Sequence, residues 1–198
     1  MTDAPATKPV RIVIADDEAI IRLDLQETLE EEGYEVVGAV GRGDDAVALV
    51  RDLSPDLAIL DIKMPGMDGI AAAKEIVAAR GAAVLILTAF SQRDLVEQAT
   101  TAGAIGYLVK PFQKSDLVPA IEVALARFRE VKALEEEVHG LEESLATRRL
   151  VDRAKGILMD RHSMSESDAF SFIQQAAMRQ RAKMAVAAQL VIDGSLLP

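Results

Sequence analysis

Apolar runs alternate with amphipathic stretches between Val10 and Lys110. Such alternation is typical of βα units arranged around a parallel sheet. Five runs are apolar enough to be strands, at residues 11–15, 35–40, 57–61, 83–89 and 105–109. Because strands that are apolar throughout are normally covered on both faces, the pattern predicts an α/β domain of the flavodoxin-like, doubly wound (βα)5 class.

Helical patterns separate these strands, at about residues 18–32, 43–53, 68–80 and 91–102. Three of them end beside Gly33, Gly81 or Gly103, which predicts a left-handed glycine cap at each of these ends. With the first part of the next helix, these elements define an expected domain of residues 9–125.

A longer helical pattern follows Lys110-Pro111, with Ser115 as the expected N-cap and no stop signal before Arg148. From residue 116 to 149 such a helix would extend about 50 Å. Apolar residues recur along it at spacings of three and four, as Val131, Leu134, Val138, Leu141 and Leu145. We call these five residues the seam, since the spacing is that of a short coiled coil. A single helix cannot bury such a stripe, so the seam should pack either on a second copy of the chain or on helices that fold back from the C-terminal domain.

Three further helical patterns follow Thr147. The first runs to about Asp160, the second starts at Ser165, and the third covers about residues 183–192 before Gly194. Residues 165–168 resemble a capping box, in which the side chain of a serine accepts a backbone hydrogen bond. The pattern therefore predicts a helical linker over residues 126–146 and a small all-α three-helix domain over residues 147–196.

Composition excludes several kinds of chemistry. The chain has no cysteine, and only His139 and His162 could supply imidazole, so a bound metal should be held by oxygen. Its apolar runs are far shorter than the roughly 20 residues that cross a bilayer. The polar start of the chain, residues 1–9, is expected to be a loose tail and not a secretion signal, which favours a cytoplasmic protein with no membrane partner.

Charge divides the chain into an acidic and a basic part. Residues 1–146 carry 27 acidic and 14 basic side chains, whereas residues 147–198 carry 5 acidic and 8 basic ones. Different roles for the two parts would explain this division, although short segments also vary this much by chance.

Reactive side chains stand at the ends of the predicted strands. If the strand order is 2-1-3-4-5, the carboxyl ends of strands one, three, four and five are neighbours, and ligands bind beyond them. At these ends lie Asp16 and Asp17, Asp61, Thr88 and Lys110. Crowded carboxylates need a cation, and Mg²⁺ prefers oxygen ligands. Asp61 ends the central strand, which makes it the expected nucleophile toward a phosphoryl donor, with Lys110 and Mg²⁺ neutralising the phosphoryl oxygens.

The same residues carry a family resemblance. Asp16-Asp17, the run 61–69 (DIKMPGMDG), Leu87-Thr88-Ala89 and the run 107–112 (YLVKPF) resemble the motifs of the response-regulator receiver domain. The resemblance implies phosphorylation of Asp61 by a sensor histidine kinase and no enzyme activity beyond slow autodephosphorylation there. It also implies three further features of the site. Mg²⁺ is held by Asp16, Asp17, Asp61 and the Lys63 carbonyl, the Lys110-Pro111 peptide is cis, and Thr88 and Tyr107 form a switch pair.

The C-terminal part has no catalytic constellation and is expected to be a binding module. Its basic side chains could neutralise RNA phosphates, although they could also be ordinary solvated helix faces. The candidates are Arg148, Arg149, Arg153, Lys155, Arg179, Arg181 and Lys183. Phe170 and Phe172 are the only aromatic residues of this part that could stack on a base, and their spacing fits one of them in the core better than a stacking platform. Contacts to an RNA loop are therefore expected from arginine, lysine and polar side chains.

Residues 153–159 (RAKGILM), 164–170 (MSESDAF), 176–179 (AAMR) and 186–187 (VA) resemble the ANTAR domain. This resemblance implies binding to RNA hairpins and transcription antitermination. Pairing of the seam between two chains would give a homodimer, which phosphorylation of Asp61 is expected to control. A DNA-binding regulator and a protein-interaction output are the alternatives. The second and third tail helices lack the clustered basic or amide-rich face that a reader of base edges needs, which counts against DNA.

Overall fold

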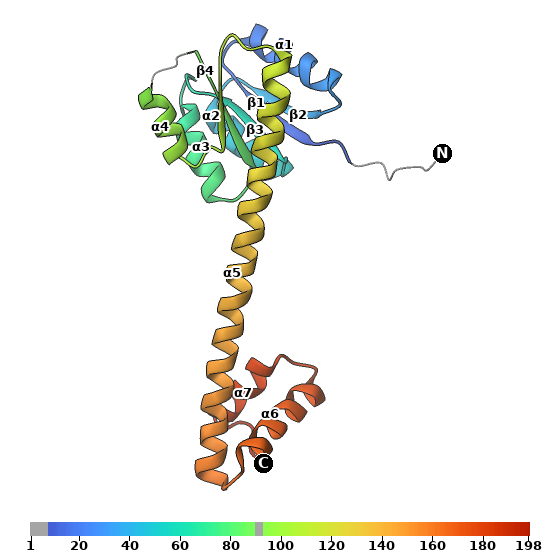
Figure 1. Ribbon diagram of the computed structural model, residues 1–198, viewed down its shortest axis with the longest axis vertical. Coiled ribbons are helices and arrows are strands. Elements are labelled where there is room, and N and C mark those ends of the chain that lie inside the picture. The colour runs from blue at the N-terminus through green and yellow to red at the C-terminus, as the bar shows by residue number, and fades with distance from the viewer. Residues whose placement is uncertain (1–7, 90–92) are drawn as a thin grey trace, which may run out of the picture. The chain divides into compact units, whose positions relative to one another are not determined.

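The computed structural model describes residues 8–89 and 93–198 of the chain (Figure 1). It divides into two compact units, Met1–Val131 and Lys132–Pro198, and each is described by itself. Most of the expected N-terminal tail and the start of the helix predicted over 91–102 lie outside the described residues. In the described part of the chain, no helix combines the length and the apolar character needed to cross a membrane.

The first unit is built on a five-stranded parallel sheet. Its strands are β1 (Arg11–Ala15), β2 (Glu35–Val40), β3 (Leu57–Asp61), β4 (Ala83–Thr88) and β5 (Gly106–Val109). Their order is β2-β1-β3-β4-β5, which confirms the predicted doubly wound topology. Asp61 is paired with Leu87, and Thr88 is paired with Val109. The carboxyl ends of the central strands are therefore nearly level, and the residues that follow them meet at one edge.

Helices cover both faces of this sheet. They are α1 (Ala19–Glu31), α2 (Gly43–Leu53), α3 (Gly69–Ala78), α4 (Arg93–Thr101) and the first part of α5 (Lys114–His162). Side chains of α1 and α5, such as Leu25 and Leu117, pack with Ile12 and Ile14 in one cluster. Side chains of α2, α3 and α4 pack with the alternate strand residues, such as Val13, in the other. The central strands β1, β3 and β4 are buried on both sides, as their apolar sequence predicts, whereas the edge strands β2 and β5 are only partly buried.

Two details of the helix ends differ from the prediction. Gly33 and Gly103 have the expected positive φ, at 85° and 87°, but after α3 the left-handed residue is Arg80. Gly81 instead allows a close approach to Val50, because a Cβ there would lie 2.8 Å from a methyl group of that residue. Ser115 is not the N-cap of α5, since the helix already begins at Lys114. The carboxylate that accepts the backbone N–H of Gln113, at 3.0 Å, belongs to Asp116.

The second unit contains the end of α5, then α6 (Glu166–Gln180) and α7 (Met184–Ile192). The expected helix break near Arg149 does not exist, because α5 continues to His162 and supplies the first helix of this unit. The Ser165 hydroxyl accepts the N–H of Asp168 at 3.2 Å, so the predicted cap is confirmed. The core consists mainly of small and aliphatic side chains, namely Val151, Ala154, Leu158, Ala169, Ile173, Ala176, Ala177, Ala187, Ala188 and Val191.

The seam has no cover within the described residues. Its five side chains are between 51% and 60% exposed. The helices α6 and α7 pack instead on the face of α5 that carries Val151, Ala154 and Leu158. The sequence leaves two possible partners for the seam, a second chain or the helices of the same chain. In the structure, the helices of the same chain do not cover it.

Candidate functional site

A lysine joins two buried carboxylates at the carboxyl edge of the sheet. Lys110 follows β5 directly, and its ammonium group donates a hydrogen bond to the carboxylate of Asp16, just beyond β1. The same nitrogen lies 2.7 Å from Oδ1 of Asp61, the last residue of β3. Asp16 is fully buried, while Asp61 is 6% and Thr88 is 2% exposed. The structure therefore brings Asp16, Asp61, Thr88 and Lys110 to one place, and Asp17 lies beside them on the surface.

Backbone groups fix the orientation of both carboxylates. The second oxygen of Asp61 accepts the N–H of Lys63 at 2.8 Å. In the same way, Asp16 accepts the N–H of Glu18 at 3.0 Å. Each carboxylate thus has one oxygen held by the backbone of the following loop and one oxygen directed at Lys110. Such fixed hydrogen bonds favour one side-chain geometry over its alternatives.

Gly69 is a residue of the site that the sequence analysis missed. A Cβ at this position would lie 1.9 Å from the backbone oxygen of Asp61, so only glycine allows the start of α3 to pack against the end of β3. The N–H of Gly69 donates to the carbonyl of Ile62 at 2.9 Å, which closes the loop after the aspartate. The signal was present in the sequence, since Gly69 is the last residue of the run 61–69.

Burial and the neighbouring charges change two pKa values. Burial raises the pKa of Asp61, and the hydrogen bond and charge of Lys110 oppose this effect without cancelling it. For Lys110, burial lowers the pKa, but its hydrogen bonds to Asp16 and Asp61 outweigh burial, so the pKa is raised. At neutral pH the lysine is therefore charged and holds the two carboxylates together.

A pocket of about 230 Å³ opens beside Asp61. Its lining residues are Asp17, Glu18, Asp61, Ile62, Lys63, Thr88, Ala89 and Lys110. Carboxylate and carbonyl oxygens suit a hard divalent cation, so the donor set of Asp17, Asp61 and Lys63 fits Mg²⁺. The described residues contain no group of three acidic or histidine side chains arranged to hold a metal. The Lys110 ammonium group pairs with Asp16 and Asp61, and Mg²⁺ binding by Asp16, Asp17, Asp61 and the Lys63 carbonyl stays a prediction.

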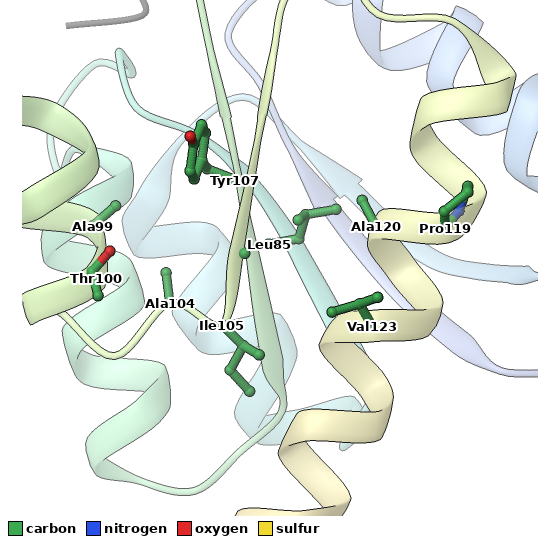
Figure 2. A pocket seen from close by; sticks show the side chains of 10 residues that line it. Leu85, Ala99, Thr100, Ala104, Ile105, Tyr107, Pro119, Ala120 and Val123 are labelled. Atoms are coloured by element: carbon green, nitrogen blue, oxygen red, sulfur yellow. The ribbon is translucent and has the colours of Figure 1, made fainter. Parts of the chain in front are cut away.

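Tyr107 lies apart from this pocket. It is 49% exposed on β5 and borders a second pocket, of about 460 Å³, between α4 and α5 (Figure 2). Thr88, by contrast, is buried at the end of β4. The Lys110-Pro111 peptide is cis, as the family resemblance implies.

The basic side chains of the second unit fall into two sets. Lys155 contacts Asp152 at 3.0 Å and Glu166 at 2.8 Å, and Lys183 contacts Glu143 at 2.6 Å. Arg148 has a longer contact of 4.0 Å with Asp152. Among the described residues, the other four candidates have no recorded ion pair, and these are Arg149, Arg153, Arg179 and Arg181. All four are exposed.

Comparisons with known proteins agree with this architecture. A family model described as the response regulator receiver domain matches residues 12–122, and one described as the ANTAR domain matches residues 139–192. The chain therefore belongs to the response regulator family, with a receiver domain followed by an ANTAR domain, and the predicted class is confirmed. The ANTAR match begins inside the segment that the pattern assigned to a linker, where α5 is continuous.

Among relatives, the chain is 58% identical over 192 residues to the transcriptional regulatory protein PdtaR of Mycobacterium tuberculosis strain ATCC 25618 / H37Rv. The match covers 97% of this chain and 94% of that protein. A two-component response regulator of the LuxR family from Aurantimonas sp. SI85-9A1 aligns with a TM-score of 0.57 at 35% identity, over 60% of this chain and 86% of its own. The CheX–CheY–BeF3–Mg+2 complex of Borrelia burgdorferi aligns with a TM-score of 0.55 at 26% identity, over 57% and 87%.

Proposed function

We propose that Asp61 accepts a phosphoryl group from a sensor histidine kinase and that this step controls RNA binding by the ANTAR domain, which acts as a transcription antiterminator. One observation carries the first part. The Asp61 carboxylate lines a pocket, 2.7 Å from the Lys110 ammonium group and beside Thr88. A carboxylate held at a pocket wall beside a fixed cation is suited to nucleophilic attack on phosphorus.

The residues divide the chemistry between them. An oxygen of Asp61 forms a bond to phosphorus while the bond from phosphorus to the histidine nitrogen of the kinase breaks, and the nitrogen keeps the electron pair. Lys110 neutralises charge on the phosphoryl oxygens, which is the main demand of this transfer. The Thr88 hydroxyl then donates a hydrogen bond to the acyl phosphate. Slow attack by water on phosphorus returns the free carboxylate and phosphate, and this autodephosphorylation is the only enzyme activity proposed.

Mg²⁺ would be held by the carboxylates of Asp17 and Asp61 and the carbonyl oxygen of Lys63, with Asp16 acting through water. When bound, the ion supplies further positive charge to the phosphoryl oxygens. The solved CheY complex, which contains BeF3 and Mg+2, supports a divalent cation in sites of this fold.

Phosphorylation is proposed to act through the seam. New negative charge at Asp61 biases the receiver between two states, in which Thr88 moves toward the phosphoryl group and Tyr107 rotates inward. The seam then pairs with that of a second copy, since its five exposed side chains have coiled-coil spacing. The resulting homodimer presents two ANTAR domains to RNA hairpins.

The test compares the wild-type protein with Asp61→Asn in acetyl phosphate and Mg²⁺. The wild type should gain the mass of one phosphoryl group, dimerise in light scattering and bind structured RNA more tightly in gel shifts. Asp61→Asn should do none of these, although its fold should be unchanged by circular dichroism. Equal phosphorylation of both proteins would show that another residue is the acceptor. If the RNA affinity of the wild type is the same with and without phosphorylation, the proposed regulation of RNA binding is refuted.

A further inference from the structure

A groove of about 810 Å³ runs along the second unit where α5, α6 and α7 meet. Its walls include Phe170 from α6, Lys183 and Met184 at the start of α7, and Arg148 and Val151 from α5. This volume is within the range of sites for small organic molecules, about 300–1,000 Å³, so one nucleotide would fit. The groove lies wholly within residues 140–184 and does not involve the phosphoacceptor site.

Phe170 is the aromatic side chain in the wall of this groove. It is 43% exposed, although its neighbours Ala169 and Ile173 are fully buried in the core. Phe172 has the packing role, because it is half-buried and contacts the core cluster. An exposed aromatic ring in a groove is a platform on which a nucleic-acid base can stack.

Cations stand at the edge of the same groove. The side chain of Arg148 is 82% exposed, and that of Lys183 is 78% exposed. Lys155 differs, since its side chain is only 17% exposed and is held between Asp152 and Glu166. It therefore fastens α6 to α5, whereas Arg148 and Lys183 remain accessible to an incoming anion.

The carboxylate of Glu143 also lines the groove, beside Lys183. It lies 2.6 Å from the Lys183 ammonium group, and both side chains are exposed, at 55% and 78%. Exposed ion pairs of this kind contribute little stability, so a phosphate oxygen can replace the carboxylate at small cost. The exchange keeps one anion on the lysine and frees Glu143 to move into solvent.

We propose that this groove receives one unpaired base of an RNA hairpin loop, which stacks on Phe170 while its neighbouring phosphate binds Lys183 in place of Glu143 and contacts Arg148. The inference rests on the proposed RNA-binding function and assigns a site to it. Stacking on a phenylalanine accepts any base, so the groove supplies affinity for an unpaired nucleotide and leaves sequence recognition to other contacts.

The deciding experiment uses the full-length protein and a pool of RNA hairpins with one constant stem and a randomised loop. Hairpins selected on the wild type, in acetyl phosphate and Mg²⁺, are then measured against Phe170→Leu and Phe170→Tyr. The Phe170→Leu protein loses one stacked base, so it should bind the hairpins about 5- to 150-fold more weakly than the wild type. The salt dependence of binding should not change, because no charge is removed. Phe170→Tyr keeps an aromatic ring and should bind as the wild type does.

A fluorescent base gives a second readout. With 2-aminopurine placed in turn at each loop position, one position should be quenched by the wild type and by Phe170→Tyr but not by Phe170→Leu. The protein contains no tryptophan, so its own emission does not obscure this signal. Thermal melting of each variant shows whether the fold is intact.

A matched pair of acidic residues tests the role of Lys183. Glu143→Gln frees this lysine, whereas Glu142→Gln makes the same charge change at an exposed residue that does not line the groove. Glu143→Gln should bind the selected hairpins about 1.5- to 5-fold more tightly than Glu142→Gln, the range expected for one exposed ion pair. Equal affinities would overturn the assignment of a phosphate to Lys183.

The outcomes separate the inference from the function on which it rests. Normal binding by Phe170→Leu, with the same quenching pattern, would overturn the groove as the base site while RNA binding stands. If the wild type binds no hairpin from the pool, both the proposed function and this inference are wrong.

Discussion

Replacing Lys110 by methionine would test whether the phosphoacceptor site is held together by one shared ammonium group. Methionine keeps much of the length and the apolar stem of lysine but removes the charge. Asp16 would remain fully buried, and the side chain of Asp61 only 8% exposed, with no cation between them. Two like charges would then be left in a poorly solvated place, and both burial and repulsion oppose this.

The structure sets the size of the effect. Removing one partner of a buried ion pair costs about 3–5 kcal/mol, and the lower end, about 3 kcal/mol at pH 7, is expected here because a pocket lets water reach Asp61. Burial already raises the pKa of Asp61 in the presence of Lys110. Without the lysine the pKa rises further, so the folded variant binds a proton more tightly than the unfolded one. The loss of unfolding free energy in Lys110→Met should therefore be largest at neutral pH. It should shrink as the pH falls and Asp61 is protonated.

Tyrosine fluorescence in a urea titration is a suitable assay. Tyr34 and Tyr107 are the only tyrosines, both lie in the first unit, and tryptophan is absent, so the signal reports that unit alone. Chelator in the buffer keeps divalent cations away from the carboxylates. The matched control is Lys114→Met. Lys114 also contacts two carboxylates, Glu31 at 3.1 Å and Glu32 at 2.7 Å, but its side chain is 46% exposed.

Loss of the exposed lysine should leave the urea midpoint almost unchanged, because solvent screens such pairs. If Lys110→Met and Lys114→Met lose the same stability, burial does not govern the site and the reasoning fails. A loss of unfolding free energy in Lys110→Met that grows as the pH falls would also refute this reasoning, since the pKa of Asp61 would then be shifted in the wrong direction.

Two further predictions concern the fold. Gly156→Ala should stabilise α5 by about 0.5–1 kcal/mol, since a Cβ there meets nothing within 4 Å, whereas Gly69→Ala should destabilise the protein because its Cβ would lie 1.9 Å from the Asp61 backbone oxygen. Thermal melts that shift in the same direction for both would contradict this. Burial and the 3.1 Å hydrogen bond to Glu122 raise the pKa of Tyr34 from 10.0 to about 12. Its stabilising effect is therefore present below pH 10 and lost as the pH rises toward 12. Absorbance at the tyrosinate band should show an ionisation near pH 12 that Tyr34→Phe abolishes.

The sheet could be predicted from sequence because each strand is apolar on both faces, a pattern that leaves few alternatives. β1, β2 and β3 have the predicted bounds. The helix ends were harder, because the left-handed residue after α3 is Arg80, while Gly81 allows a close approach to Val50. Contacts between distant elements decide such details, and a local sequence pattern contains no information about them.

The site was predictable in its members but not in its pairing. Strand order alone brings Asp16, Asp61 and Lys110 to one edge. It does not say that the Lys110 ammonium group pairs with both Asp16 and Asp61. A count of charges cannot separate a buried cation that is already paired from an accessible one. The same difficulty affected the C-terminal part, where Lys155 joins α5 to α6 and Arg149 has no ion pair with any residue that the structure describes.

The continuity of α5 explains why the seam remains without cover. A break near Arg149 would have let a separate helix turn back and pack on Leu141 and Leu145. Instead the same helix continues to His162, and α6 and α7 pack on its other residues, around Ala154 and Leu158. The helices α6 and α7 already form this core with α5. They could cover the seam only if these core contacts were lost. A second copy of the chain can cover the seam and leave this core intact, so the packing of the second unit supports the proposed homodimer.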